Sequence, residues 1–159
     1  MKITIQKALE QDVESINIIE QESFKTPWSY QSLFEDICQT ELAYYLTAKT
    51  EDRKVIGYIG MWHVLDEAHI TNVAVDKDHR KIGVGTALLK ALIDYSKEAG
   101  IKRMTLEVRE NNVYALKLYE NLGFVSYGKR KGYYQDTGED AVIMWKELFG
   151  PTGKPEDIF

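Results

Sequence analysis

An apolar run that ends in a glycine turn and continues as a helix is the most constraining feature of this sequence. The run ITNVAV (70–75) has the composition of a buried strand, and from Val84 onwards apolar residues recur at helical spacing. Between the two lies DHRKIGVG (78–85), with two glycines one residue apart. The pattern predicts a strand joined to a helix by a tight turn, and therefore helices packed on a sheet.

The rest of the chain divides into further runs of the same two kinds. Alternating or continuous apolar runs predict seven strands in all, at 3–8, 42–49, 54–65, 67–75, 102–109, 124–134 and 138–148. Helical spacing predicts four helices, at 10–22, in the segment after Ser29, from Val84 to Gly100 and at 111–123. The order predicts a mixed α/β domain with helices on both faces of one sheet.

Composition narrows the class of protein. The 159 residues are 44% hydrophobic with a net charge of −5, which suffices for one core and argues against a nucleic-acid partner. No apolar run approaches the roughly 20 residues of a membrane span, and the first residues do not resemble a signal peptide. The single cysteine, Cys38, excludes an internal disulfide and favours a reducing compartment. We expect a cytoplasmic protein with one domain at 1–149 and a flexible tail at 150–159.

The glycine turn allows two interpretations. It is no Walker loop, because no Gly-Lys-Ser/Thr follows, and Gly83-x-Gly85 lacks the third glycine of a dinucleotide fingerprint. Glycines before a helix let backbone amides approach a phosphate, and Arg80 and Lys81 add positive charge. A turn that binds no ligand has the same composition, so the spacing alone leaves both interpretations open.

Separated motifs along the chain resemble those of a known enzyme family. Arg80-x-x-Gly83-x-Gly85, after a strand ending in NVAV, resembles the pyrophosphate loop of the GNAT acetyltransferases, and LEVRENN (106–112) with ALKLYENLGF (115–124) resembles their later strand and helix. Four more motifs are similar to those of the RimI-like branch, the ribosomal-protein-alanine N-acetyltransferases: TPWS, DEAHITNVAV, RKGYY and GEDAVIM. The resemblance runs from about residue 3 to 147. It implies the GNAT fold, with a central, mostly antiparallel, seven-stranded sheet.

The resemblance also implies acetyl-CoA as co-substrate. The strand edge at Val73, Ala74 and Val75 would pair with the pantetheine amides, and the turn would hold the pyrophosphate. The turn residues so implied are Arg80, Lys81, Ile82, Gly83, Val84, Gly85 and Thr86. Asn112 would offer its side-chain amide to the cofactor arm, although an asparagine there also suits a helix cap.

Two residues are implied to carry the chemistry. Glu107 matches the general base of the family, acting directly or through water, and Tyr119 matches the tyrosine that protonates the departing sulfur. From the residues alone, Glu107 is equally compatible with a solvated glutamate or one paired with Arg109, and Tyr119 with a packing residue.

The kind of amine determines how hard such a base must work. A peptide α-amine, with a pKa of about 7.8, is about one quarter neutral at about pH 7.4, whereas a lysine amine, at about 10.4, is neutral in about one part in a thousand. A single glutamate without a histidine partner fits the α-amine better.

Acceptor binding is implied for an aromatic and basic set consisting of Trp28, Arg130, Tyr133 and Tyr134. Such side chains suit an extended peptide end, although the two tyrosines equally suit a cover over the core. The chain has Gly132 where members of the family carry asparagine.

Other reactive side chains point to no further chemistry. The three histidines, His63, His69 and His79, lack the spacing of metal ligands, so we expect no metal. Cys38 has apolar neighbours, so we expect it to pack and not to act as a nucleophile. Direct transfer in a ternary complex is the expected mechanism.

These observations predict an enzyme that acetylates the N-terminal α-amine of a protein, the N-terminal alanine of a small-subunit ribosomal protein, and acts as a monomer without nucleic-acid or membrane partners. One alternative is a GNAT enzyme for lysine side chains or a small amine, and TPWS and RKGYY disfavour a small amine. The other is a non-catalytic acetyl-CoA-binding module, against which the presence of both Glu107 and Tyr119 argues.

Overall fold

The structure, a computed structural model, describes residues 2–149 and divides into two compact units. The N-terminal unit comprises the chain up to His63 together with Ile70–Asp94. The C-terminal unit comprises Val64–His69 and the chain from Tyr95 onwards. The expected tail at 150–159 lies outside the described residues, and the domain extent of 1–149 stays a prediction.

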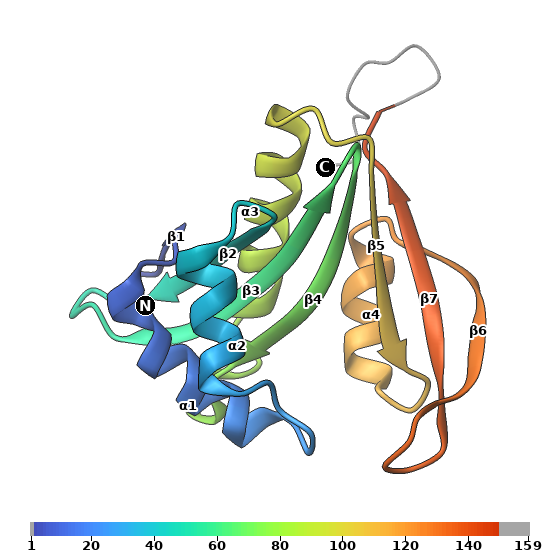
Figure 1. The fold of residues 1–159 in the computed structure, drawn as a ribbon, viewed down its shortest axis with the longest axis horizontal. Coiled ribbons are helices and arrows are strands. Elements are labelled where there is room, and N and C mark those ends of the chain that lie inside the picture. Colours follow the sequence, from blue (N-terminus) through green and yellow to red (C-terminus); the bar gives the residue numbers. More distant parts are fainter. Residues whose placement is uncertain (1, 150–159) are drawn as a thin grey trace. The chain divides into compact units, whose positions relative to one another are not determined.

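Seven strands and four α-helices make up the scaffold of the described residues (Figure 1). The strands are β1 (Thr4–Lys7), β2 (Ala43–Lys49), β3 (Val55–Val64), β4 (Glu67–Val75), β5 (Arg103–Arg109), β6 (Val125–Tyr134) and β7 (Glu139–Glu147). The α-helices are α1 (Val13–Ser23), α2 (Tyr30–Phe34), α3 (Val84–Glu98) and α4 (Val113–Asn121). The strands form one mixed sheet in the order β1-β2-β3-β4-β5-β7-β6. Every predicted strand and helix is therefore confirmed, with small shifts at the ends.

Helices cover both faces of the sheet in the N-terminal unit (Figure 1). On one face, Ile16 of α1 and Tyr58 of β3 belong to the same buried cluster. On the other face β3 presents Gly57 to α3, where an added Cβ would lie 3.1 Å from Val84 and 3.2 Å from Leu88. Because β3 is buried on both sides over most of its length, its sequence is a continuous apolar run and does not alternate.

Strands β1, β2 and β3 pair antiparallel to one another, and the short polar segment EDRK (51–54) connects the second to the third. A buried ion pair joins β2 to the turn before α1, with Lys49 Nζ 3.0 Å from a carboxylate oxygen of Asp12. Ser29 begins α2 as predicted, since its hydroxyl accepts the Ser32 N–H at 3.1 Å. A single π-helical turn, Glu35–Gln39, extends this helix.

Strand β5 is the centre of the C-terminal unit. It pairs in parallel with the first residues of β4, where His69 lies opposite Thr105, and antiparallel with β7, which also pairs with β6. Side chains of β5 alternate between buried positions and a half-buried face, as its sequence predicts. The pairing of β6 with β7 is irregular between Arg130 and Tyr134, so the residues between these two leave the ladder.

Cys38 is exposed, so the expectation that it packs against apolar neighbours is wrong. It lies in the π-helical turn, where the wider winding changes which residues face the core.

Within residues 2–149, no helix combines the length and the hydrophobicity that crossing a membrane requires.

Candidate active site

Glu107 lies in a polar cluster of the C-terminal unit. One carboxylate oxygen lies 3.4 Å from His69 Nε2 and accepts a hydrogen bond from the Tyr133 hydroxyl, also at 3.4 Å. The other lies 3.8 Å from a guanidinium nitrogen of Arg130. The Glu107 side chain is 17% exposed and that of His69 is 42% exposed. These contacts are long for hydrogen bonds and open to solvent, so the carboxylate can exchange partners, as a general base must.

Strands from separate parts of the sequence bring this cluster together. His69 is registered with Thr105, and Glu107 follows two residues later on the same face of β5. Arg130 and Tyr133 come from the irregular part of β6. Gly132 lies within this part at φ 61°, a left-handed conformation that glycine and asparagine adopt most readily. This explains why glycine can stand where the family carries asparagine.

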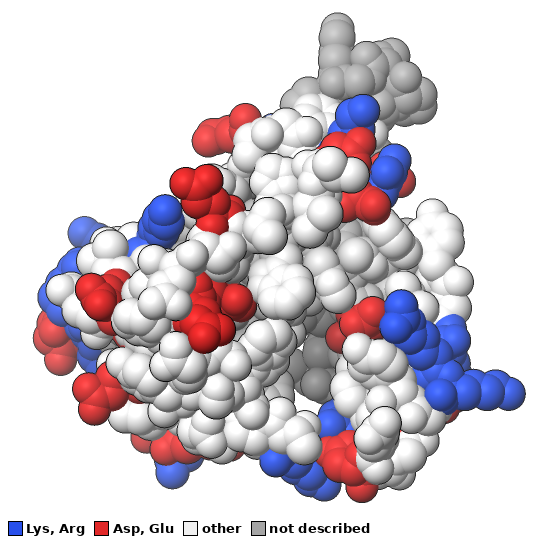
Figure 2. Space-filling view, viewed as in Figure 1, with Lys and Arg blue, Asp and Glu red and all other residues white. Residues whose placement is uncertain are grey.

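Positive charge gathers along β6. Figure 2 shows Lys and Arg side chains clustered over the part of the molecule where Figure 1 draws this strand, whose sequence includes Lys129, Arg130 and Lys131. Lys129 pairs with Glu110, and the Arg130 guanidinium lies 5.5 Å from the centre of the Tyr133 ring. Burial and the neighbouring Glu107 raise the pKa of Tyr133, so its hydroxyl remains a donor to that carboxylate.

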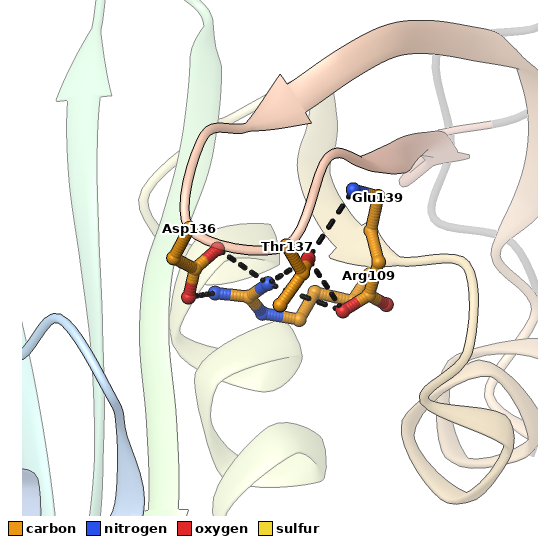
Figure 3. A network of polar contacts seen from close by, with 4 residues as sticks. All are labelled: Arg109, Asp136, Thr137 and Glu139. Atoms are coloured by element: carbon orange, nitrogen blue, oxygen red, sulfur yellow. Dashed lines mark hydrogen bonds and ion pairs between the residues drawn. The ribbon is translucent and has the colours of Figure 1, made fainter.

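Arg109, at the end of β5, holds the turn between β6 and β7 (Figure 3). Its guanidinium donates to both carboxylate oxygens of Asp136, at 3.0 and 2.9 Å, and lies 3.3 Å from the Thr137 hydroxyl and 3.4 Å from Glu139. It also stacks 4.1 Å from the centre of the Tyr134 ring. The hydrogen bond from Arg109 lowers the pKa of Asp136. The network thereby fixes both the turn and Tyr134.

Three tyrosine side chains of the C-terminal unit, Tyr133, Tyr134 and Tyr119, keep their hydroxyl protons. The Tyr134 ring meets Tyr133 edge-on with 5.1 Å between centroids, and burial raises the pKa of Tyr134 to about 12. Tyr119 of α4 is buried and packs edge-on against Phe124 at 5.6 Å. Burial, and secondly Tyr134, raise the pKa of Tyr119. Its hydroxyl therefore keeps its proton at neutral pH and is a hydrogen-bond donor.

The glycine turn of the N-terminal unit has the geometry of an anion site. Lys81 and Gly83 both adopt left-handed conformations, at φ 64° and 89°, and a Cβ added to Gly83 would meet nothing within 4 Å. The Ala87 N–H donates to the Gly83 carbonyl at 3.0 Å. The three residues before Ala87 form the first turn of α3, where N–H groups have no carbonyl within the helix to bond. Open space, these donors and the helix dipole fit a phosphate group.

Short contacts tie this turn to the end of β4. The Arg80 Nε donates to the Val75 carbonyl at 3.0 Å. His79 Nδ1 lies 2.7 Å from an Asp76 carboxylate oxygen, and this hydrogen bond lowers the pKa of Asp76. Arg80, Lys81, Ile82 and Gly83 are exposed, whereas Val84 and Gly85 are buried and Thr86 is half-buried. Of the predicted strand edge, Ala74 is buried and Val73 and Val75 are half-buried.

Trp28 is held against α1 in the N-terminal unit. Its backbone N–H donates to a buried Glu20 oxygen at 2.9 Å, and its carbonyl accepts from Gln21 Nε2 at 3.0 Å. The indole meets Trp62 edge-on with 6.1 Å between ring centroids.

Asn112 caps α4, because its side-chain oxygen accepts the Ala115 N–H at 3.1 Å. The amide nitrogen of the same side chain lies outside that contact, so a cap and a ligand contact can coexist. Among residues 2–149, no three His, Cys, Asp or Glu side chains are arranged to hold a metal ion.

The arrangement corresponds to known proteins. The sequence profile described as the Acetyltransferase (GNAT) family matches residues 12–124. The chain belongs to the GNAT family of acetyltransferases. It is 38% identical over 135 residues to the [ribosomal protein bS18]-alanine N-acetyltransferase of Escherichia coli (strain K12), covering 84% of this chain and 89% of the relative. This GNAT chain is an N-acetyltransferase and uses acetyl-CoA.

Solved structures of the family share the fold. The ribosomal-protein-S18-alanine N-acetyltransferase from Escherichia coli superimposes with a TM-score of 0.85 at 35% identity, covering 92% of this chain and 94% of that one. Ard1 from Thermoplasma volcanium superimposes with a TM-score of 0.82 at 27% identity, covering 94% of this chain and all of that one, 100%. The predicted GNAT fold is therefore confirmed.

The structure brings together part of the predicted set. Glu107, Arg130 and Tyr133 share one cluster, with Tyr134 beside it, whereas the glycine turn and Trp28 belong to the N-terminal unit. Arg109, one of the partners that the sequence offered for Glu107, pairs instead with Asp136 and Glu139. The expectation that Glu107 lacks a histidine partner is wrong, because His69 Nε2 lies 3.4 Å from its carboxylate. The residue pattern did not indicate His69 as a functional residue, and only the pairing of β4 with β5 places it beside Glu107.

Proposed function

We propose that this N-acetyltransferase modifies the N-terminal α-amine of a protein, and that its substrate is the N-terminal alanine of ribosomal protein bS18. The Escherichia coli relative, named for that activity, supports the substrate. The observation that carries the proposal is the partly exposed Glu107 carboxylate, which contacts Arg130 and Tyr133. Acetylation of a peptide amine requires a base, and aromatic and basic side chains around that base can bind the peptide.

Glu107 is proposed to receive the proton that the amine loses, directly or through a water molecule. The amine nitrogen attacks the thioester carbonyl carbon, the new C–N bond forms and the C–S bond breaks. One proton leaves nitrogen and one reaches sulfur, so the step is balanced. An α-amine, about one quarter neutral at about pH 7.4, makes a modest demand on the base.

Tyr119 is proposed to assist the departing sulfur. Its hydroxyl is protonated and buried, so it can donate a hydrogen bond to the thiolate as charge develops there. Because the pKa of Tyr119 is raised, a strong hydrogen bond to the sulfur is favoured over complete proton transfer. Solvent can then protonate the departed thiolate, which gives the thiol of CoA.

The acetyl-CoA contacts are proposed from the turn and the strand before it. The backbone N–H groups of the turn, Arg80 to Thr86, would bind the pyrophosphate, and Arg80 and Lys81 add charge. The backbone of Val73–Val75 would pair with the pantetheine amides as an added strand does. Asn112 would reach the same arm with its amide nitrogen, while its oxygen caps α4.

The acceptor contacts are proposed for Trp28, Arg130, Tyr133 and Tyr134. The Arg109 guanidinium stacks on the Tyr134 ring, and the irregular part of β6 carries Tyr133. The backbone of Trp28 is held by its hydrogen bond to Glu20. We further propose that residues 1–149 act as one catalytic domain, as a monomer, in the cytoplasm where ribosomal proteins are made.

Acetyl transfer to a panel of short peptides, measured by mass spectrometry, tests this function. The panel begins with Ala, Ser or Met, and one peptide has a blocked N-terminus and an internal lysine. We expect turnover on the free alanine peptide and its loss in Glu107→Gln, with acetyl-CoA binding retained. Modification of the blocked peptide would show a lysine-directed enzyme, and turnover of a small amine alone would show a small-molecule enzyme. Either result would reject the proposed acceptor.

A further inference from the structure

His69 is the neighbour of Glu107 to which no role has been assigned. Its Nε2 lies 3.4 Å from a Glu107 carboxylate oxygen, within the distance of an ion pair once the imidazole is protonated. The pair is held by the backbone, because β4 and β5 are registered there and His69 lies opposite Thr105. The contact therefore results from strand pairing and does not depend on a flexible loop.

The charged and titratable groups near His69 are few. On β5 they are Glu107 and, at the far end of the ladder, Arg103, which pairs with Glu147; on β4 there is Glu67. From β6, Arg130 and Tyr133 both approach the same carboxylate as His69. His69, Arg130 and Tyr133 therefore share one acceptor, the Glu107 carboxylate.

A carboxylate alone is a weak acceptor for an ammonium proton. With ordinary values of about 4.3 for a carboxyl and about 7.8 for an α-ammonium, the transfer is unfavourable by about 3,000-fold. An imidazole, with an ordinary value of about 6.5, reduces this to about 20-fold. A carboxylate beside an imidazole also stabilises the imidazolium, as in other acid–base pairs.

We propose, resting on the proposed function, that His69 is the proton relay partner of Glu107. The proton that leaves the acceptor nitrogen is taken up at the Glu107 carboxylate and passes to His69 Nε2. The imidazolium then releases it to solvent, because the His69 side chain is 42% exposed whereas that of Glu107 is only 17% exposed. The Tyr133 hydroxyl and Arg130 hold the carboxylate while the proton moves. No oxidant, reductant or metal enters the step.

His69→Gln tests the relay, with His63→Gln as the matched control on β3. A glutamine keeps a polar side chain on the strand but cannot accept the proton. We expect kcat/KM for the alanine peptide to fall about 10- to 100-fold at about pH 8.5, where the imidazole of the parent is free to accept the proton, and by less at about pH 6.5, where protonation already slows the relay in the parent. For the control, His63→Gln, we expect kcat/KM to stay within about twofold of the parent at both pH values.

The pH profile separates a relay from a structural role. In the parent, the acid limb of log kcat/KM should have a slope near 2, because both the amine and the Glu107–His69 pair must be deprotonated; in His69→Gln the slope should be near 1. Added imidazole should restore activity to His69→Ala and leave the rate of the His63→Ala control unchanged. A loss that is equal at every pH, or an unchanged profile, would overturn the relay.

Failure of the proposed function gives a different result. If the parent acetylates another amine and not an α-amine, kcat/KM of the parent and of His69→Gln is compared with that amine. A pH-dependent defect of the variant still supports the relay. If the parent acetylates no amine in the panel while acetyl-CoA binds, both proposals are rejected. A parent active on the alanine peptide with an unaffected His69→Gln rejects the relay alone.

Discussion

Two glutamates, Glu20 in the N-terminal unit and Glu107 in the C-terminal unit, are held in opposite ways. Glu20 is 1% exposed and accepts the Trp28 N–H at 2.9 Å, an Asn72 amide hydrogen at 3.1 Å and the Tyr58 hydroxyl. Burial and the nearby Glu20 raise the pKa of Tyr58, so the phenol remains a donor. Without the carboxylate the buried Tyr58 hydroxyl and the half-buried Trp28 N–H would lose this acceptor, and the Asn72 amide would keep only its contact with Tyr58.

Glu107 has the same chemical group in a looser setting. Its contacts to His69, Tyr133 and Arg130 are 3.4 to 3.8 Å long, and solvent reaches it. A carboxylate that accepts short bonds from buried donors stabilises the fold and is costly to protonate. A carboxylate with long, solvated contacts can take up a proton without loss of stability. The comparison teaches that burial and short bonds together distinguish the structural Glu20 from Glu107, the proposed base.

The largest expected effect is on catalysis at the loosely held glutamate. Glu107→Gln should lower kcat for the alanine peptide by about 10²- to 10⁴-fold, because a positioned base contributes an effect of that size. Its thermal unfolding midpoint should stay close to the parent value. The measurement is steady-state kinetics beside a thermal melt. A variant that remains fully active would remove Glu107 from the reaction.

The next effect is on stability at the buried glutamate. Glu20→Ala should lower the free energy of unfolding by about 3 kcal/mol, since it removes the acceptor of three donors, the buried Tyr58 hydroxyl among them, and opens a cavity. Chemical denaturation with far-UV circular dichroism measures it. Glu22→Ala, on the exposed side of the same helix, is the control and should change little. Equal effects in both variants would refute the comparison.

A smaller effect is expected where the Arg109 network supports Tyr134. Arg109→Lys loses the paired hydrogen bonds to Asp136 and the stacking on the ring, since an ammonium provides neither geometry. We expect KM for the acceptor peptide to rise about fivefold with little change in KM for acetyl-CoA. Arg103→Lys, whose pair with Glu147 is exposed, is the matched control. A change confined to acetyl-CoA would contradict the assignment.

The smallest effect is a pH dependence of the β6–β7 turn. Since Arg109 lowers the pKa of Asp136 in the folded protein, the ion pair stabilises the turn above the usual aspartate range and is lost as pH falls through the lowered value. The Thr137 and Gly138 amide signals in NMR spectra should therefore hold their positions at about pH 5 and move only below about pH 4. In Arg109→Lys the same change should begin at higher pH; identical titrations would show that the bond is not formed in solution.

Much of the fold was open to prediction from the sequence. The alternation of β5, the caps at Ser29 and Asn112, and the strand–glycine–helix connection each depend on neighbouring residues, and all are present in the structure. The exposure of Cys38 was not predictable, because one π-helical turn changes the helical register that the prediction assumed.

The sequence by itself determined the order of the elements, the glycine turn and the family, since hydrophobic period, caps and motifs are local. Tertiary structure alone decided the partners of the charged groups. It placed His69 beside Glu107 through the pairing of β4 with β5, and it directed Arg109 to Asp136 through the β6–β7 turn. Such pairings depend on strand register and on turns that join distant residues, and no local pattern encodes them.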